Sequence, residues 1–183
     1  MTSLPLSVIN QFIEVCQWTY DVWSTHRSLF NDNPQRASLR ASPAGDGLYR
    51  LSIISQEYLL QQIVKLHDPA RQNGEENLGF DYICQCGGWD TDVSAKLQTL
   101  KMRLDEFAQK IRPARHKILS HFDLKTALSG SKLGDFPEGE DIEYFRLLQE
   151  FVNVVHNAVI GEPYLFSDDA KKDAMALLSC LKL

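Results

Sequence analysis

A short basic segment carries the residue types best suited to acid–base chemistry on a phosphate. Within twelve residues it gathers two arginines, two histidines, a lysine and an aspartate: Arg112, Arg115, His116, Lys117, His121 and Asp123. Histidine exchanges a proton near neutral pH, and arginine offers a permanently charged, planar pair of donors to phosphate. These groups could cleave RNA without a metal, because a base can activate the ribose 2′-hydroxyl while arginine stabilises charge on the phosphorane.

The spacing limits how these side chains could act together. Arg115 and His121 are six residues apart, which separates them by about 120° around an ideal helix. One straight helix would therefore not direct both at the same phosphate. A kink near Pro113, or a second copy of the chain across a dimer interface, would bring them together. The alternative interpretation is a solvated basic helical face without a catalytic role.

The charge pattern sets this segment apart from the rest of the chain. The formal net charge of −5 argues against a protein that coats nucleic acid by bulk electrostatics. Residues 101–125 nevertheless hold seven basic and three acidic side chains, an excess of +4 against −9 elsewhere. We therefore predict a locally positive segment on an acidic background.

The elements that must position this segment are helices. Apolar residues recur at three- and four-residue steps over residues 6–30, 48–66 and 141–160, the last from Ile142 to Val159. Asp90 or Thr91 can cap the helix that leads into the basic segment. Its apolar positions form a heptad-like seam of Val93, Leu97, Leu100, Leu104, Phe107 and Ile111. Pro113 then predicts a kink or a new helix.

The connecting segments follow from their turn-forming residues. Residues 31–47 are rich in Asn, Asp, Pro, Ser and Gly, which predicts a long loop with Arg36 and Arg40 as solvated side chains. Asn77 is expected to cap a short helix ending near residue 85, and Ser167 to cap the last helix. His67 is interpreted as the end of its helix, and no strand-like alternation is found.

These patterns predict an all-α protein, an antiparallel bundle of about five to six helices. It is expected to be one domain over residues 1–183, with a motif-bearing core at about 48–160 and a C-terminal helix at about 167–182. With no signal peptide or membrane span apparent, the expectation is a soluble cytoplasmic protein without a membrane partner. The cysteine pair Cys84 and Cys86 has no second pair at zinc-ligand spacing, so neither metal nor cofactor is predicted.

Two stretches resemble one group of proteins. Residues 115–123, Arg-His-Lys-Ile-Leu-Ser-His-Phe-Asp, resemble the arginine–histidine motif of the HEPN superfamily, in particular its AbiU-like abortive-infection branch. Residues 63–70, Ile-Val-Lys-Leu-His-Asp-Pro-Ala, followed by Glu-Asn-Leu at 76–78, resemble the segment that precedes the motif helix in that branch. The resemblance covers roughly residues 48–128.

The resemblance implies roles for the basic segment. Arg115 would contact the phosphate, and His121 would be the general acid or base. The other members would support this pair: Arg112, His116, Lys117 and Asp123, the last by orienting His121 or capping local backbone.

The resemblance also implies a biological setting. Many members of the superfamily are helical homodimers that cleave RNA without metal in toxin–antitoxin or phage-defence systems, and the expected products carry 2′,3′-cyclic phosphates. RNA would then be the substrate and an antitoxin protein a possible partner. Other branches have lost activity, so a catalytically inactive helical module that binds a protein or nucleotide remains the alternative.

Overall fold

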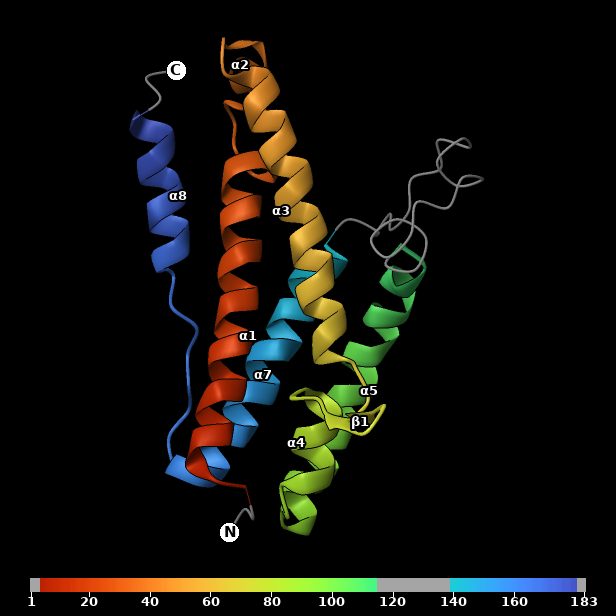
Figure 1. Ribbon diagram of the computed structural model, residues 1–183. Helices are drawn as coiled ribbons and strands as arrows, with labels where there is room; N and C mark the ends of the chain where they lie inside the picture. Colours follow the sequence, from red (N-terminus) through yellow and green to blue (C-terminus); the bar gives the residue numbers. More distant parts are fainter. Residues whose placement is uncertain (1–3, 115–138, 181–183) are drawn as a thin grey trace. The chain divides into compact units, whose positions relative to one another are not determined.

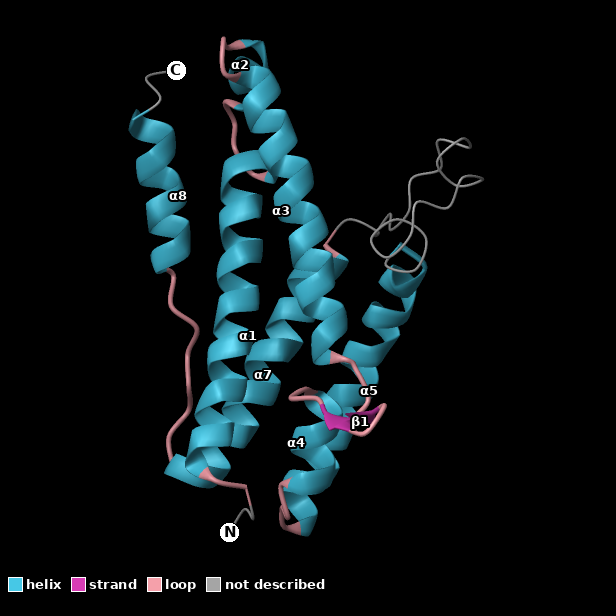
Figure 2. Cartoon of the chain, in the orientation of Figure 1, coloured by secondary structure: helices cyan, strands magenta, loops and turns pink. Residues whose placement is uncertain are grey.

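The computed structural model of the chain describes residues 4–114 and 139–180. Within these ranges the regular secondary structure is helical apart from one short hairpin (Figure 2), so the prediction of an all-α fold is confirmed. Two compact units are distinguished: Met1–Cys16 with Gln61–Leu165, and Gln17–Leu60 with Phe166–Leu183. The expectation of a single domain stays a prediction. None of the helices in the described ranges offers a long enough apolar stretch to cross a membrane.

The first unit is built around two long helices, α5 (Thr91–Ala114) and α7 (Glu140–Ile160), which pack together (Figure 1). It also holds the start of α1 (Leu6–His26), the end of α3 (Gly45–Leu66) and α4 (Phe80–Cys86). The Asp90 carboxylate accepts the Val93 N–H at 2.9 Å, as predicted for the cap of α5. α7 ends at Gly161 with a φ of 87°, which glycine adopts readily.

The core of this unit is the apolar seam predicted for α5. Five of its members are buried: Leu97, Leu100, Leu104, Phe107 and Ile111. α7 faces them with a run of buried aromatic and aliphatic side chains, among them Phe145, Leu148, Phe151 and Val155. The Phe151 ring meets Phe80 edge to face with centroids 4.9 Å apart, and Phe12 meets both rings. Ile142 is exposed, so the prediction that it belongs to the inward face of α7 is wrong.

The second unit contains the remainder of α1 and α3, and α8 (Asp169–Cys180). The predicted first helix is confirmed as α1, which passes into a π-helical turn, η1 (Arg27–Asn31), and α8 contacts η1 (Figure 1). The segment before α8 is attached to α1, because the Phe166 ring stacks on Tyr20 at 4.9 Å. The Ser167 hydroxyl accepts the Asp169 N–H at 3.0 Å, which confirms its predicted capping role.

The long loop predicted over residues 31–47 is wrong. This stretch contains a helix, α2 (Arg36–Ala41), and α3 already begins at Gly45. Asn33 explains the helix: its buried side chain accepts the Gln35 N–H at 2.9 Å and donates to the Leu29 carbonyl at 3.2 Å. Leu39 is buried as well, so a polar composition concealed one turn-forming residue before the helix and one apolar anchor within it.

A two-residue hairpin, β1 (Arg71–Gln72) paired with β2 (Glu75–Glu76), corrects the expectation that strands are lacking. Its turn is Asn73-Gly74, whose φ values of 55° and 90° are the left-handed conformation that these two residues favour. Asn77 does not cap α4, which begins after Gly79. Its side chain donates to the Pro69 carbonyl at 2.8 Å instead, and so closes the loop that carries the hairpin.

Candidate active site

The predicted site begins where α5 ends. Arg112 lies in the last turn of α5, and the helix continues through Pro113 to Ala114, so it does not stop at the proline. The predicted residues that follow lie outside the described residues: Arg115, His116, Lys117, His121 and Asp123. The candidate site is therefore described through the end of α5 and the residues that contact it.

A buried polar network lies about two helical turns before Arg112. His67, which follows α3, is 5% exposed. Its Nδ1 lies 2.6 Å from Asp105 Oδ1 on α5, and its Nε2 lies 3.2 Å from the Tyr144 hydroxyl on α7. A carboxylate can only accept, so Nδ1 carries the proton and Nε2 accepts from the tyrosine. The network thus joins the end of α3 to both long helices.

The charges of the network are balanced. Lys101 donates to Asp105 at 2.6 Å and pairs with Asp81 of α4 at 2.9 Å. Burial lowers the pKa of His67 and outweighs the Asp105 carboxylate, which raises it, so the imidazole is neutral. Burial alone would raise the pKa of Asp105, but hydrogen bonds from His67 and Lys101 hold that pKa below its ordinary value. Burial also raises the pKa of Tyr144, which keeps its hydroxyl protonated as a donor.

The same histidine anchors the last turn of α5. Arg112 Nη2 donates to the His67 backbone carbonyl at 3.2 Å. Asp105 and Arg112 therefore both hold His67 from one face of α5, the former through the imidazole and the latter through the main chain. This arrangement fixes the helix from which the motif follows, and it gives Arg112 a positioning contact.

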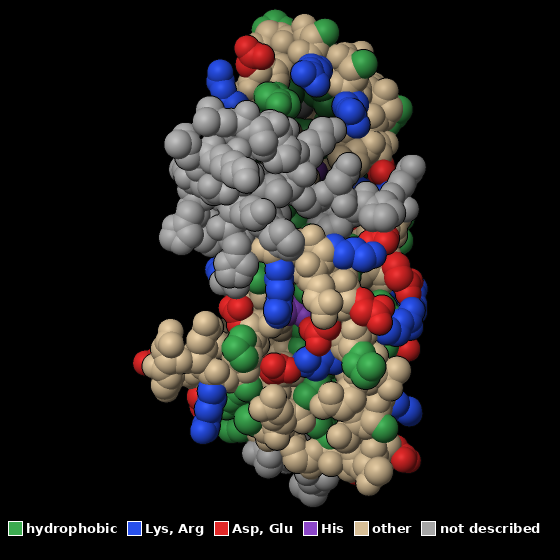
Figure 3. Space-filling view, turned by 90° about the vertical axis from the view of Figure 1, so that its right-hand side faces the viewer, with side chains coloured by type: hydrophobic (Ala, Val, Ile, Leu, Met, Phe, Trp, Pro, Cys, Tyr) green, Lys and Arg blue, Asp and Glu red, His purple; other side chains and the backbone are tan. Residues whose placement is uncertain are grey.

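The basic residues of α5 do not form a positive surface. Arg103 pairs with Glu143 at 2.6 Å, and Lys110 pairs with Glu140 at 2.6 Å, both across to α7. On the face shown in Figure 3, basic side chains lie beside acidic ones. The positive excess predicted for residues 101–125 is therefore offset over its described half.

Metal-ligating side chains do not cluster in the part of the chain that the structure describes. No three His, Cys, Asp or Glu side chains gather there as metal ligands would. Cys84 and Cys86 both lie on α4 and are half-buried. Burial raises the pKa of the Cys84 thiol to about 12, so this thiol is protonated at neutral pH.

Comparison with known protein families shows which family the chain belongs to. The profile of the HEPN AbiU2 family, described as AbiU2, matches residues 6–177. The chain belongs to this family. The match covers the described helices of both units except the last three residues of α8. It runs through the arginine–histidine stretch, so the resemblance found in the sequence is confirmed. No curated protein and no solved structure matches the chain.

The family assignment gives a context for the loop between α3 and α4. Residues 63–70 and 76–78 of this HEPN AbiU2 chain resemble the segment that precedes the motif helix, and His67 within it contacts α5. Sequence reasoning interpreted His67 only as a helix end. Its partners Asp105 and Tyr144 lie 38 and 77 residues away, beyond any local pattern.

Proposed function

We propose that this HEPN AbiU2 protein is a metal-independent endoribonuclease acting in phage defence or a toxin–antitoxin system. The observation that carries the proposal is the family match over residues 6–177, which includes the Arg115–His121 pair. A histidine base takes the proton of a ribose 2′-hydroxyl, and the 2′-oxygen attacks the adjacent phosphorus. The bond to the 5′-oxygen breaks, that oxygen takes up a proton, and a 2′,3′-cyclic phosphate remains. Arg115 stabilises the charge on the phosphorane.

Two copies of the chain are part of the proposal. Arg115 and His121 of one straight helix would diverge by about 120°, so a second motif helix supplies the missing group. The anchoring of α5 through His67 and Arg112 supports this arrangement, because paired motifs require helices with fixed directions. Light scattering is expected to give the mass of a dimer, and a monomeric mass at working concentration would contradict this part.

The second candidate is a catalytically inactive helical module that binds a protein or nucleotide. The observation in its favour is the pairing of Arg103 and Lys110 with Glu143 and Glu140. These ion pairs, together with a net charge of −5, reduce the attraction for RNA that a nuclease would use.

The decisive experiment is cleavage of a mixed RNA pool in excess chelator. Native protein is expected to cut, and Arg115→Ala and His121→Ala are each expected to lose about 100-fold or more. His156→Ala is the matched control, since this α7 histidine bonds the Glu162 carbonyl at 2.6 Å and lies outside the motif; it should stay within about twofold of native activity. No cutting by native protein would leave the inactive module, and cutting that survives His121→Ala would remove the case for catalysis at this motif.

A further inference from the structure

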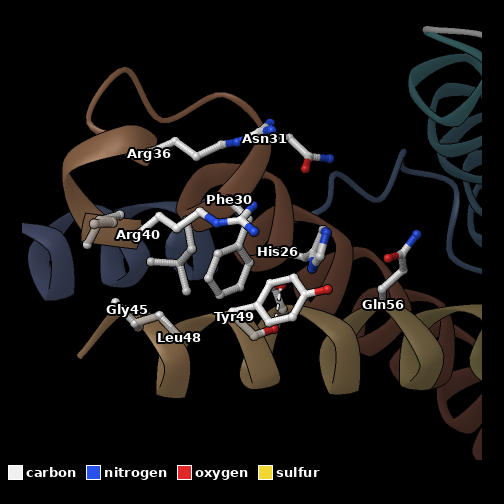
Figure 4. A pocket seen from close by; sticks show the side chains of 12 residues that line it. His26, Phe30, Asn31, Arg36, Arg40, Gly45, Leu48, Tyr49 and Gln56 are labelled. Atoms are coloured by element: carbon white, nitrogen blue, oxygen red, sulfur yellow. Dashed lines mark hydrogen bonds between the residues drawn. The ribbon is translucent and has the colours of Figure 1, made fainter. Parts of the chain in front are cut away.

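The second unit contains a cavity of about 220 Å³ between α2, α3 and η1 (Figure 4). Its lining combines two guanidinium groups with aromatic and hydrogen-bonding side chains, and none of its described lining residues is acidic. The arginines come from α2 and their side chains extend in the same direction across the cavity (Figure 4). The main polar and aromatic members are Asn31, Arg36, Arg40, Tyr49, Ser52 and Gln56.

The two arginines are suited to hold a phosphate. They lie four residues apart on α2, and within the described ranges neither guanidinium has a carboxylate partner. Arg40 Cζ lies 5.2 Å from the centroid of the Tyr49 ring, a contact that orients the guanidinium without occupying its N–H donors. The nearby Asp32 pairs with Arg27 at 2.6 Å. Two planar, permanently charged donors without carboxylate partners are the kind of groups that bind phosphate.

The backbone holds α2 in place beside α3. A Cβ on Gly45 would overlap the Arg40 carbonyl oxygen, so the close approach of the two segments requires glycine. The Ser42 hydroxyl donates to the Leu39 carbonyl at 2.7 Å, and the Leu39 side chain is buried. The arginines thus project from an anchored turn and not from the loop that the sequence suggested.

We propose that this pocket binds a nucleoside phosphate. Arg36 and Arg40 hold the phosphate, the Tyr49 ring with its stacked guanidinium offers a platform for a base, and Ser52 and Gln56 supply hydrogen bonds. The cavity is smaller than the roughly 300–1,000 Å³ of drug-sized sites, which suits a phosphate with part of its nucleoside. The ligand is either a free nucleotide or one nucleotide of an RNA strand. Binding here goes beyond the proposed nuclease and does not need the chemistry of its motif.

Binding by the full-length protein tests the proposal with two probes. One is a fluorescent single-stranded oligonucleotide with 2′-O-methyl sugars, which cannot be cut through a 2′-hydroxyl; the other is adenosine monophosphate followed by calorimetry. Arg36→Ala and Arg40→Ala are each expected to weaken binding about tenfold or more. Arg50→Ala, which removes the same charge from an exposed α3 position outside the pocket, should change it less than about threefold.

The outcomes separate the sources of the phosphate. Binding of the strand with this pattern of variants assigns the pocket to RNA, and binding of the mononucleotide with the same pattern assigns it to a free nucleotide. Gly45→Ala moves Arg40 without changing charge and is expected to act like Arg40→Ala, with circular dichroism to check folding. Failure of native protein to bind either probe, or equal weakening by Arg50→Ala, would overturn the proposal. Loss of RNA cutting alone would refute the nuclease and leave this site standing.

Discussion

Replacing Tyr144 with phenylalanine removes one atom from the network that holds α5. The hydroxyl donates to His67 Nε2 at 3.2 Å, and the tyrosine is 1% exposed, so water cannot replace the lost donor. The ring stays in place against Phe107, at a centroid distance of 4.6 Å. A buried acceptor left without a partner costs about 1–3 kcal/mol. Because this bond is long, we expect Tyr144→Phe to lower the free energy of unfolding by about 1–2 kcal/mol.

Urea unfolding followed by far-ultraviolet circular dichroism measures this loss, with the slope against denaturant expected to stay unchanged. Tyr82→Phe is the matched control, because it makes the same chemical change where the hydroxyl lies at the surface, 3.4 Å from Glu76. The control should change stability by less than about 0.5 kcal/mol. An equal, small effect of both substitutions would refute the assignment of the Tyr144 hydroxyl as a donor to neutral His67.

Three further predictions concern the same unit. Burial lowers the pKa of His67 from 6.5, so the unfolded chain takes up a proton on this imidazole at a higher pH than the folded chain does. The free energy of unfolding should therefore fall as pH drops below 6.5, by at most about 1.4 kcal/mol per pH unit. Denaturation at several pH values measures this dependence, and the same dependence in His67→Gln would contradict the prediction. Asp105→Ala should cost about 2–3 kcal/mol in chemical unfolding, whereas its exposed α5 neighbour Glu106→Ala should cost under about 0.5; equal costs would argue against the network. Gly74→Ala places a Cβ at a φ of 90° and should lower the free energy of unfolding by about 1–2 kcal/mol. A thermal melt measures this loss, and an unchanged melting temperature would contradict the prediction.

The long helices could be predicted because each carries its own signal. The seam of α5 repeats at the spacing of a helical face, and Asp90 caps it as expected, so local sequence alone determines both the start and the buried side. α7 is similar, and only Ile142 departs from its predicted face because it lies in the first turn, where the helix face meets solvent.

The features that were missed depend on contacts distant in sequence or on single side chains. α2 forms within a composition typical of loops because Asn33 and Leu39 fix it, and the Asn73-Gly74 turn was the one available signal for the hairpin. His67 could not be recognised, since Asp105 and Tyr144 reach it only when α5 and α7 pack together. Arg36 and Arg40 are exposed, as predicted. Their place beside one cavity could not be predicted, because Tyr49 lies on a different helix.

The chemistry of the RNA ends tests the central claim most directly. Native protein and a defined RNA are incubated in excess chelator, and the fragments are analysed by mass spectrometry. The proposed mechanism predicts a 2′,3′-cyclic phosphate on one fragment, a 5′-hydroxyl on the other, and no cutting where a single 2′-deoxynucleotide precedes the bond. Fragments with a 3′-hydroxyl and a 5′-phosphate, or unchanged cutting at the 2′-deoxynucleotide, would contradict it.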